Sequence, residues 1–252
     1  MLMGDNLIKV IKNNMVIFMS IGIFVTFFIG YTVGVGSDQN TSTLQQELKY
    51  LEQKIDDLEN RDAFPTTKIS KDDDPILGNP DAPISIIEFS DYQCPYCARF
   101  YFETLPLLEE QYIEKGIVNF IYRDFPIQNS HPNAMVAAIA SECADDQGKF
   151  WEYHDMLFDQ QSTWRSLETN LAISTFKQFA LNLGLKQESF DSCLDSGKYF
   201  DEVNKDLADG RSNKISGTPA FFIGNDKLGY TSIFGAKSFS DFQSIINKKL
   251  DP

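Results

Sequence analysis

The residues with the clearest capacity for chemistry are Cys94 and Cys97, in the run Cys-Pro-Tyr-Cys. Two thiols separated by two residues at the start of a helix can close into a small disulfide ring and reopen by exchange with another thiol. Pro95 suits the first helical position, where its missing N–H would have no partner. Cys94 is then expected at the helix cap, where free N–H groups and the helix dipole favour its thiolate. We therefore predict that Cys94 is the nucleophile and that Cys97 is the more buried partner.

The alternative for this pair is half of a zinc site. A zinc ribbon needs a second closely spaced pair, whereas the remaining cysteines, Cys143 and Cys193, are 50 positions apart. The two histidines, His131 and His154, complete no ligand pattern, and we expect both to be packed within the fold with satisfied partners. We favour redox chemistry, and we predict no metal site and no cofactor.

Composition limits the class of protein. The 252 residues include 22 Lys+Arg and 36 Asp+Glu, which gives a formal net charge of −14. Because phosphate binding needs a basic surface, this acidity argues against nucleic acid as a partner. A hydrophobic content of 42% is ample for a packed core.

The N-terminal part has the pattern of a membrane anchor. Residues 15–35 are 21 consecutive residues without a charge, and Lys9 and Lys12 precede them. A helix of that length spans a bilayer, and the positive-inside rule keeps residues 1–14 in the cytoplasm. The alternative is a cleaved signal peptide, but the apolar run exceeds the usual ~7–15 residues. Both alternatives place the rest of the chain outside the cytoplasm, and we favour a single-pass anchor in the cell membrane.

A helical stalk and a linker are expected next. Residues 37–61 carry an a/d stripe of five apolar residues: Leu44, Leu48, Leu51, Ile55 and Leu58. The stripe lasts about two heptads, short of the ~3–4 that make a coiled coil convincing, so a solvated helix and a homodimer through the stalk both stay open. Residues 62–82 form a proline-containing linker, in which we interpret Asp72–Asp74 as a solvated charge run.

From residue 84 onward, strand signals and helix signals alternate along the chain. Their order predicts one α/β domain with a helical insertion. Strand signals at 84–89 and 117–122 enclose the helix that follows the cysteine motif, which is a βαβ unit with parallel strands. Residues 131–212 contain only helical patterns. Strand signals return at 220–223 and 229–234, before a final helix over about 238–249.

Several motifs together point to a family. The runs DAPISIIEFSDYQCPYCARF, YRDFP…HPNAM, QGKFWEYHDMLF and GTPAFFIGN occur in this order. Over roughly residues 75–250 the chain resembles the DsbA-like thioredoxin-fold family of thiol–disulfide oxidoreductases. The resemblance implies a thioredoxin-like domain formed by residues 83–130 and 213–252, with residues 131–212 as the inserted helical domain.

The resemblance also implies roles for individual residues. Cys94 and Cys97 match the catalytic pair, and Pro219 matches the family's cis-proline beside the disulfide. Such a proline leaves the backbone of Thr218 free to pair with an extended substrate, with Pro95 and Tyr96 also at the substrate-binding surface. The residues alone leave Pro219 open as an ordinary proline at the start of a strand.

Glu88 lies six positions before Cys94 in a strand otherwise made of Ile, Ser and Phe. An acid in such a strand is expected to be at least partly buried, which raises its pKa. The resemblance implies a buried acid here that moves protons for the second cysteine. The alternative is a solvated glutamate at the end of a strand.

Cys143 and Cys193 are predicted to form a structural disulfide, because exported proteins retain disulfides and related family members carry a cysteine pair here. The alternative is two separate buried thiols. Tyr96 departs from the best-known oxidases of the family, in which a histidine often stands between the cysteines. This departure removes one cation that could stabilise the Cys94 thiolate and leaves the direction of electron flow open.

Three functions follow as expectations. The leading one is a membrane-tethered oxidase that forms disulfides in cysteine-containing exported proteins and is reoxidised by a membrane redox partner. The second is a disulfide reductase or isomerase of the same fold. The third is a non-catalytic tethered binding or chaperone module with a structural cysteine pair.

Overall fold

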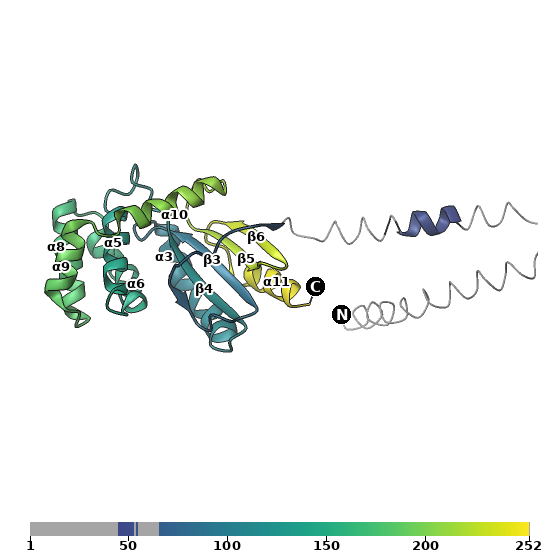
Figure 1. Cartoon of the computed structure of the whole chain (residues 1–252), viewed down its shortest axis with the longest axis horizontal. Helices are drawn as coiled ribbons and strands as arrows, with labels where there is room; N and C mark the ends of the chain where they lie inside the picture. The colour runs from purple at the N-terminus through teal and green to yellow at the C-terminus, as the bar shows by residue number, and fades with distance from the viewer. Residues whose placement is uncertain (1–44, 53, 55–65, 252) are drawn as a thin grey trace, which may run out of the picture. The chain divides into compact units, whose positions relative to one another are not determined.

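The computed structural model describes residues 45–52, 54 and 66–251 (Figure 1). The predicted anchor at 15–35 and the N-terminal residues 1–14 lie outside these ranges. Among the described helices none is long and apolar enough to cross a membrane. Of the predicted stalk, residues 45–52 and 54 are described and are helical. Residues 64–252 form one compact unit, and the following paragraphs concern that unit alone.

A six-stranded sheet forms the centre of this unit, in the order β1-β6-β5-β3-β4-β2. Strands β3 and β4 are parallel, as the βαβ pattern predicts, and the other neighbouring pairs are antiparallel. The bounds of the strands are β1 Thr66–Thr67, β2 Ile76–Leu77, β3 Ile84–Ser90, β4 Val118–Asp124, β5 Ala220–Asn225 and β6 Gly229–Phe234.

Both faces of the central strands are covered, so β3 is buried along its whole length. Because successive side chains point to opposite faces, Ile84 and Ile86 join the core cluster that contains Cys97 and Phe100 of α3. Ile87 and Phe89 join a second cluster, which contains Leu207 of α10. Burial on both faces explains why apolar side chains of β3 point to both sides of the sheet.

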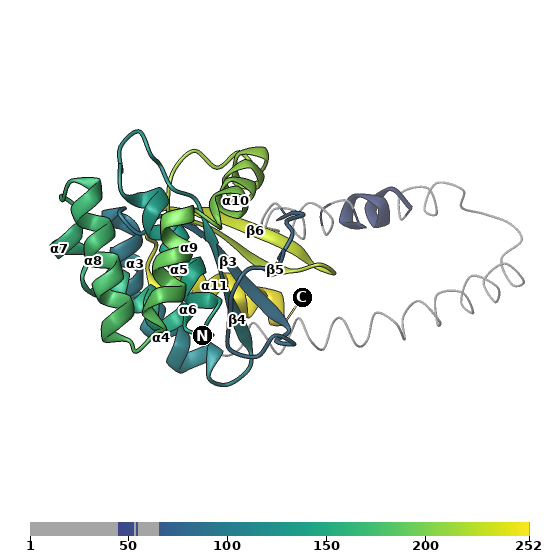
Figure 2. The same cartoon turned by 60° about the vertical axis from the view of Figure 1, so that its left-hand side comes forward.

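Helices cover the sheet and extend beyond it. The first group is α3 Pro95–Glu103, α4 Leu105–Leu108, the π-helical turn η1 Glu109–Ile113 and the C-terminal α11 Phe239–Leu250. The second group is α5 Ala134–Asp145, α6 Phe150–Asp159, α7 Gln161–Trp164, α8 Thr169–Asn182, α9 Gln187–Ser196 and α10 Phe200–Ser212. In both views α5, α6, α8 and α9 gather beside the sheet as a helical group (Figures 1 and 2). The thioredoxin-like α/β fold with a helical insertion is therefore confirmed.

The predicted linker is more structured than its composition indicates. Its strands β1 and β2 pair with β6 and β4 at the two edges of the sheet. The interpretation of Asp72–Asp74 as a solvated run is wrong for Asp74, whose side chain is 7% exposed and pairs with the buried Arg123, with 2.7 Å between Nε and Oδ2. Asp206 of α10 pairs with the same guanidinium. A buried arginine needs such carboxylates, and they are contributed by residues far away in the sequence.

Candidate active site

The cysteine motif occupies the first turn of α3. The helix begins at Pro95, and Cys94 is its N-cap residue in an extended conformation. The backbone N–H of Cys94 donates to the carbonyl oxygen of Asp91 at 3.0 Å, which closes a tight turn after β3. The Cys94 sulfur therefore lies at the positive end of α3, as the motif predicts.

The two thiols are held in different environments, and they are not joined in this structure. Cys94 is 3% exposed and its Sγ lies 3.5 Å from the carbonyl oxygen of Thr218, whereas Cys97 is fully buried. The hydrogen bond from Cys97, helped by backbone N–H groups of the first turn, lowers the pKa of Cys94 to about 6. Burial raises the pKa of Cys97 well above its usual range, and the nearby Cys94 raises it further. At neutral pH the arrangement favours a thiolate on Cys94 and a proton on Cys97.

Pro219 comes from a distant part of the chain and lies directly before β5. The Thr218–Pro219 peptide bond is cis, as the resemblance implies. The carbonyl of Thr218 faces the Cys94 sulfur, while the carbonyl of Pro219 accepts a hydrogen bond from the N–H of Gly235 at 2.8 Å. The sheet therefore fixes this loop against the first cysteine.

Glu88 lies on the same face of β3 as Ile84 and Ile86, toward α3. Its side chain is buried, and its Oε1 accepts a hydrogen bond from the hydroxyl of Ser90 at 2.8 Å. Burial raises the pKa of Glu88 to about 8, against the opposing effect of Ser90. The prediction of a buried acid is confirmed, and the alternative of a solvated glutamate is wrong. Glu88 is also among the charges that raise the pKa of Cys97.

The helical insertion holds the loop that leads to Cys94, which the sequence did not predict. The amide nitrogen of Gln161 in α7 donates to the carbonyl oxygens of Tyr92 and Cys94, at 2.8 and 3.1 Å. Gln93 accepts a hydrogen bond from the N–H of Asn133 at 2.7 Å. These contacts fix the backbone on the N-terminal side of the motif.

The two histidines have different surroundings. His154 is buried among aromatic rings, including those of Tyr92, Tyr122 and Phe158, and burial lowers its pKa. Nδ1 of His131, in contrast, lies 2.7 Å from the carboxylate oxygen Oδ2 of Asp91. Asp91 belongs to the loop that precedes Cys94. Both rings have partners, as predicted, but the position of His131 beside the motif was not predicted. The pair is separated by 40 residues, so no local pattern connects its members.

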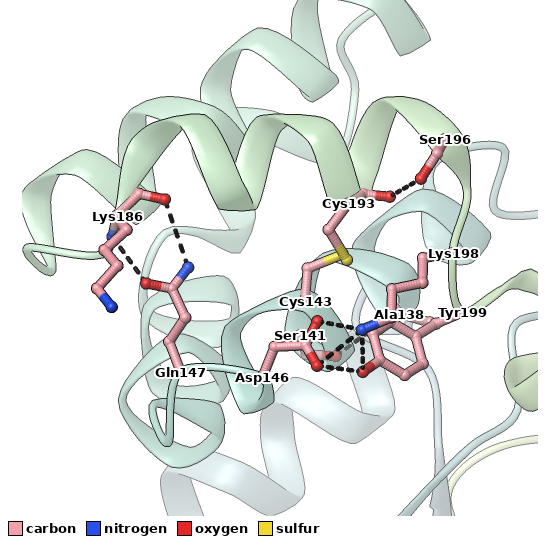
Figure 3. The surroundings of a disulfide bond; sticks show 10 residues. All are labelled: Ala138, Ser141, Cys143, Asp146, Gln147, Lys186, Cys193, Ser196, Lys198 and Tyr199. Carbon is pink, nitrogen blue, oxygen red and sulfur yellow. Dashed lines mark hydrogen bonds and ion pairs between the residues drawn. A yellow bond between two sulfur atoms is a disulfide. The ribbon is translucent and has the colours of Figure 1, made fainter.

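Cys143 of α5 and Cys193 of α9 form a disulfide, as predicted (Figure 3). Beside it, the ammonium group of Lys198 pairs with Asp146, whose carboxylate also accepts a hydrogen bond from the hydroxyl of Tyr199. The disulfide ties together two helices of the insertion, whereas the cysteine motif lies at the start of α3.

Comparisons with known proteins agree with this geometry. A family model described as "Thioredoxin" matches residues 70–248. "Disulfide bond formation protein D" of Bacillus subtilis is 31% identical over 179 residues, which cover 68% of this chain and 73% of that protein. The crystal structure of Wolbachia pipientis alpha-DsbA1 superposes with a TM-score of 0.64 at 27% identity, covering 72% of this chain and 92% of that one.

Longer relatives share only this region. "Na(+)/H(+) antiporter NhaA 3" of Salinispora tropica is 30% identical over 155 residues, which are 62% of this chain and only 22% of the length of that protein. The match to the family model covers most of the chain, and the fold and cysteine geometry agree with it. The chain therefore belongs to the DsbA-like thioredoxin-fold family of thiol–disulfide oxidoreductases.

Proposed function

We propose that this protein is a membrane-anchored, extracytoplasmic thiol–disulfide oxidoreductase that forms disulfides in exported proteins. The observation that carries the proposal is the opposite shift of the two thiol pKa values, downward for Cys94 and upward for Cys97. A stabilised Cys94 thiolate favours the reduced form of the motif, so its disulfide is readily given away. Family membership supports the reaction class, and the name of the Bacillus subtilis relative supports the direction.

The cycle consists of two thiol–disulfide exchanges. A substrate thiolate attacks the Cys94 sulfur of the Cys94–Cys97 disulfide, the bond between the two cysteines breaks, and Cys97 leaves with the electron pair and takes up a proton. A second substrate thiolate then attacks the substrate sulfur of the mixed disulfide and releases Cys94 as a thiolate. The substrate loses two electrons and the motif gains them. An external oxidant, which we propose is a membrane redox partner, restores the disulfide.

The surroundings of Cys94 support a substrate site formed by Pro95, Tyr96 and Thr218. The ring of Tyr96 is 57% exposed beside the cysteine, with the guanidinium group of Arg99 above it at 5.3 Å. The Thr218 carbonyl next to the cis-proline faces the reacting sulfur. An extended cysteine-containing segment of an exported protein could pair with this backbone while its thiolate approaches Cys94.

Residues 15–35 supply the anchor in this proposal, with residues 1–14 in the cytoplasm and the catalytic unit outside the cell membrane.

The heptad stripe within 37–61 supports a homodimer through the stalk. The test is the size of the chain in detergent micelles, with and without residues 37–61. A monomer in both cases would remove the stalk from the proposal.

The reduction potential of Cys94–Cys97 tests the direction of electron flow. We expect a value toward the −120 mV of a strong oxidase, measured by equilibrium with glutathione in a Cys143→Ala/Cys193→Ala variant beside the parent protein. A value at or below about −230 mV would instead favour a reductase or isomerase, because the disulfide would then be too stable to be given away readily.

Glu88→Gln is expected to slow the first exchange. Because its pKa is about 8, Glu88 is protonated at neutral pH and can supply the proton that Cys97 takes up as it leaves. We expect the rate constant for oxidation of a reduced peptide to fall about a hundredfold at pH 7, at the lower end of the range for general acids, because the raised pKa of Cys97 makes its thiolate a poor leaving group without a proton. Rapid mixing of the oxidised protein with peptide measures this rate constant.

The matched control is Glu142→Gln, since Glu142 is another largely buried acid with a pKa of about 8 but has no cysteine among the main charges that act on it. Equal slowing in both variants would contradict the role.

The same substitution should change the pH dependence of stability. The folded protein keeps the Glu88 proton up to about pH 8, whereas the unfolded chain loses it near pH 4.5. Between these values the folded state binds more protons, so the free energy of unfolding falls as pH rises, and Glu88→Gln removes the contribution of Glu88 to this fall. Urea unfolding of the parent and the variant at several pH values measures it.

A further inference from the structure

The segment that follows β4 is fastened to the loop that precedes Cys94. The N–H of Ile127 donates to Oδ2 of Asp91 at 2.8 Å, and Nδ1 of His131 lies 2.7 Å from the same oxygen. Two residues further on, the N–H of Asn133 donates to Gln93 at 2.7 Å. Residues 127–133 therefore lie along the loop, and His131 is held between two of these attachments.

Asp91 connects the histidine to the reactive cysteine. Its side chain is fully buried, and its second carboxylate oxygen accepts a hydrogen bond from the N–H of Gln93 at 2.8 Å. Its own carbonyl oxygen accepts the hydrogen bond from the N–H of Cys94. A buried negative charge this close to Cys94 would oppose a thiolate there unless a cation balanced it.

His131 is positioned to supply the cation that balances the negative charge of Asp91. A carboxylate only accepts hydrogen bonds, so Nδ1 donates to Asp91, and Nε2 is the nitrogen that gains or loses a proton. The side chain is 18% exposed, so the ring can exchange protons with solvent. Its hydrogen bond to Asp91 raises the pKa of His131, and the charges of Asp91 and Cys94 raise it further, while partial burial and the charge of Arg165 after α7 oppose them.

We propose that His131, positioned by Asp91, supplies the positive charge that stabilises the Cys94 thiolate in a motif whose two central residues, Pro95 and Tyr96, carry none. The inference rests on the thiol exchange at Cys94 proposed above, and it holds for either direction of electron flow. His131 is a positioning and electrostatic residue, because it acts on the thiolate and does not touch the substrate in this scheme.

A pH effect follows from this arrangement. Below the pKa of His131 the imidazolium stabilises the thiolate, and therefore the reduced form of the motif. As the pH rises through that pKa, the positive charge is lost and the motif becomes less oxidising. The charged groups that set the pKa of His131, and therefore the pH range of this effect, are Asp91 in the loop after β3, Cys94 at the start of α3 and Arg165 after α7.

The test uses the full chain in detergent and the absorbance of the thiolate near 240 nm as a function of pH. We expect His131→Gln to raise the pKa of the Cys94 thiol by about one unit, which is a tenfold change in the ionisation constant. The equilibrium constant with glutathione should shift by up to the same factor, about 30 mV toward a less oxidising motif. His131→Lys, which retains a positive charge, should recover at least half of the change in pKa.

Asp155→Asn is the matched control. It removes the exposed carboxylate that pairs with the other histidine, His154, at 2.9 Å, and it should leave the Cys94 pKa unchanged. An unchanged Cys94 pKa in a folded His131→Gln variant would overturn the proposal. So would a change of the same size in Asp155→Asn.

A second measurement needs no substitution. The chain has only two histidines, so their ring protons can be followed by NMR in the parent protein. Linkage is reciprocal, so the pKa of His131 must be higher in the dithiol form than in the disulfide form. Equal values in the two forms would overturn the proposal, even if His131→Gln failed to fold. A parent protein with a low reduction potential would contradict the oxidase function but would leave this comparison intact.

Discussion

Replacing Cys94 with serine is expected to reduce disulfide transfer to the uncatalysed background. In the proposed cycle the Cys94 sulfur forms the mixed disulfide, and a hydroxyl oxygen cannot replace it in thiol–disulfide exchange. The lowered pKa of Cys94 makes it the better nucleophile and leaving group of the pair at neutral pH. The measurement is oxidation of a reduced two-cysteine peptide, with glutathione disulfide as the terminal oxidant.

Cys97→Ser is the matched variant for this test. It retains the Cys94 thiol but removes the partner that resolves a mixed disulfide, so reaction with an activated disulfide should leave a stable adduct on Cys94. Mass spectrometry of the intact protein detects the adduct. Full peptide oxidation by a folded Cys94→Ser protein would contradict the assigned site, whereas a parent protein that oxidises the peptide no faster than the uncatalysed background would favour the non-catalytic binding module.

Removing the disulfide of the insertion is expected to have the largest effect on stability. The Cys143–Cys193 bond closes a loop over a sequence separation of 50, for which the chain-entropy rule gives a stabilisation of about 4 kcal/mol. Both sulfurs lie at the contact of α5 with α9, so Cys143→Ala/Cys193→Ala also removes packing there. We expect the melting temperature to fall by roughly 8–16 °C, on the scale for a domain of this size.

Lys198→Met is the control for the surroundings of that bond. It removes the exposed ion pair with Asp146 beside the disulfide, which is expected to contribute little to the free energy of unfolding because solvent screens both charges (Figure 3). The double alanine variant should still oxidise the peptide at a temperature at which it is folded, because the disulfide is not part of the cysteine motif. A melting temperature within about 2 °C of the parent would contradict a stabilising role for this disulfide.

The sequence by itself determined the elements and the type of chemistry. Alternation and periodicity are local properties, so the parallel pair β3 and β4 and the helical composition of the insertion could be predicted from them. The helix start at Pro95 could be predicted because the chemistry of the first helical turn involves neighbouring residues only. Cys94 and Cys97 are likewise neighbours, and their spacing alone favours redox chemistry over zinc.

Other features were predicted from the resemblance to a family and not from local chemistry. The cis bond before Pro219 was one of several conformations that its sequence allowed. The pairing of Cys143 with Cys193 required that two separate helices pack together, which no property of either helix predicts.

Only the tertiary structure decided which charges face one another. Asp74 lies in a segment with the composition of a solvated linker, yet it is buried against Arg123, because the chain folds back across the edge of the sheet. His131 and Asp91 form their hydrogen bond across 40 residues, because the insertion begins where β4 ends, next to the end of the parallel strand β3. The pKa of a side chain depends on all the groups around it in space, whatever their distance along the chain. The position of Cys94 at the start of a helix was therefore predictable from sequence, whereas the charged groups around it were not.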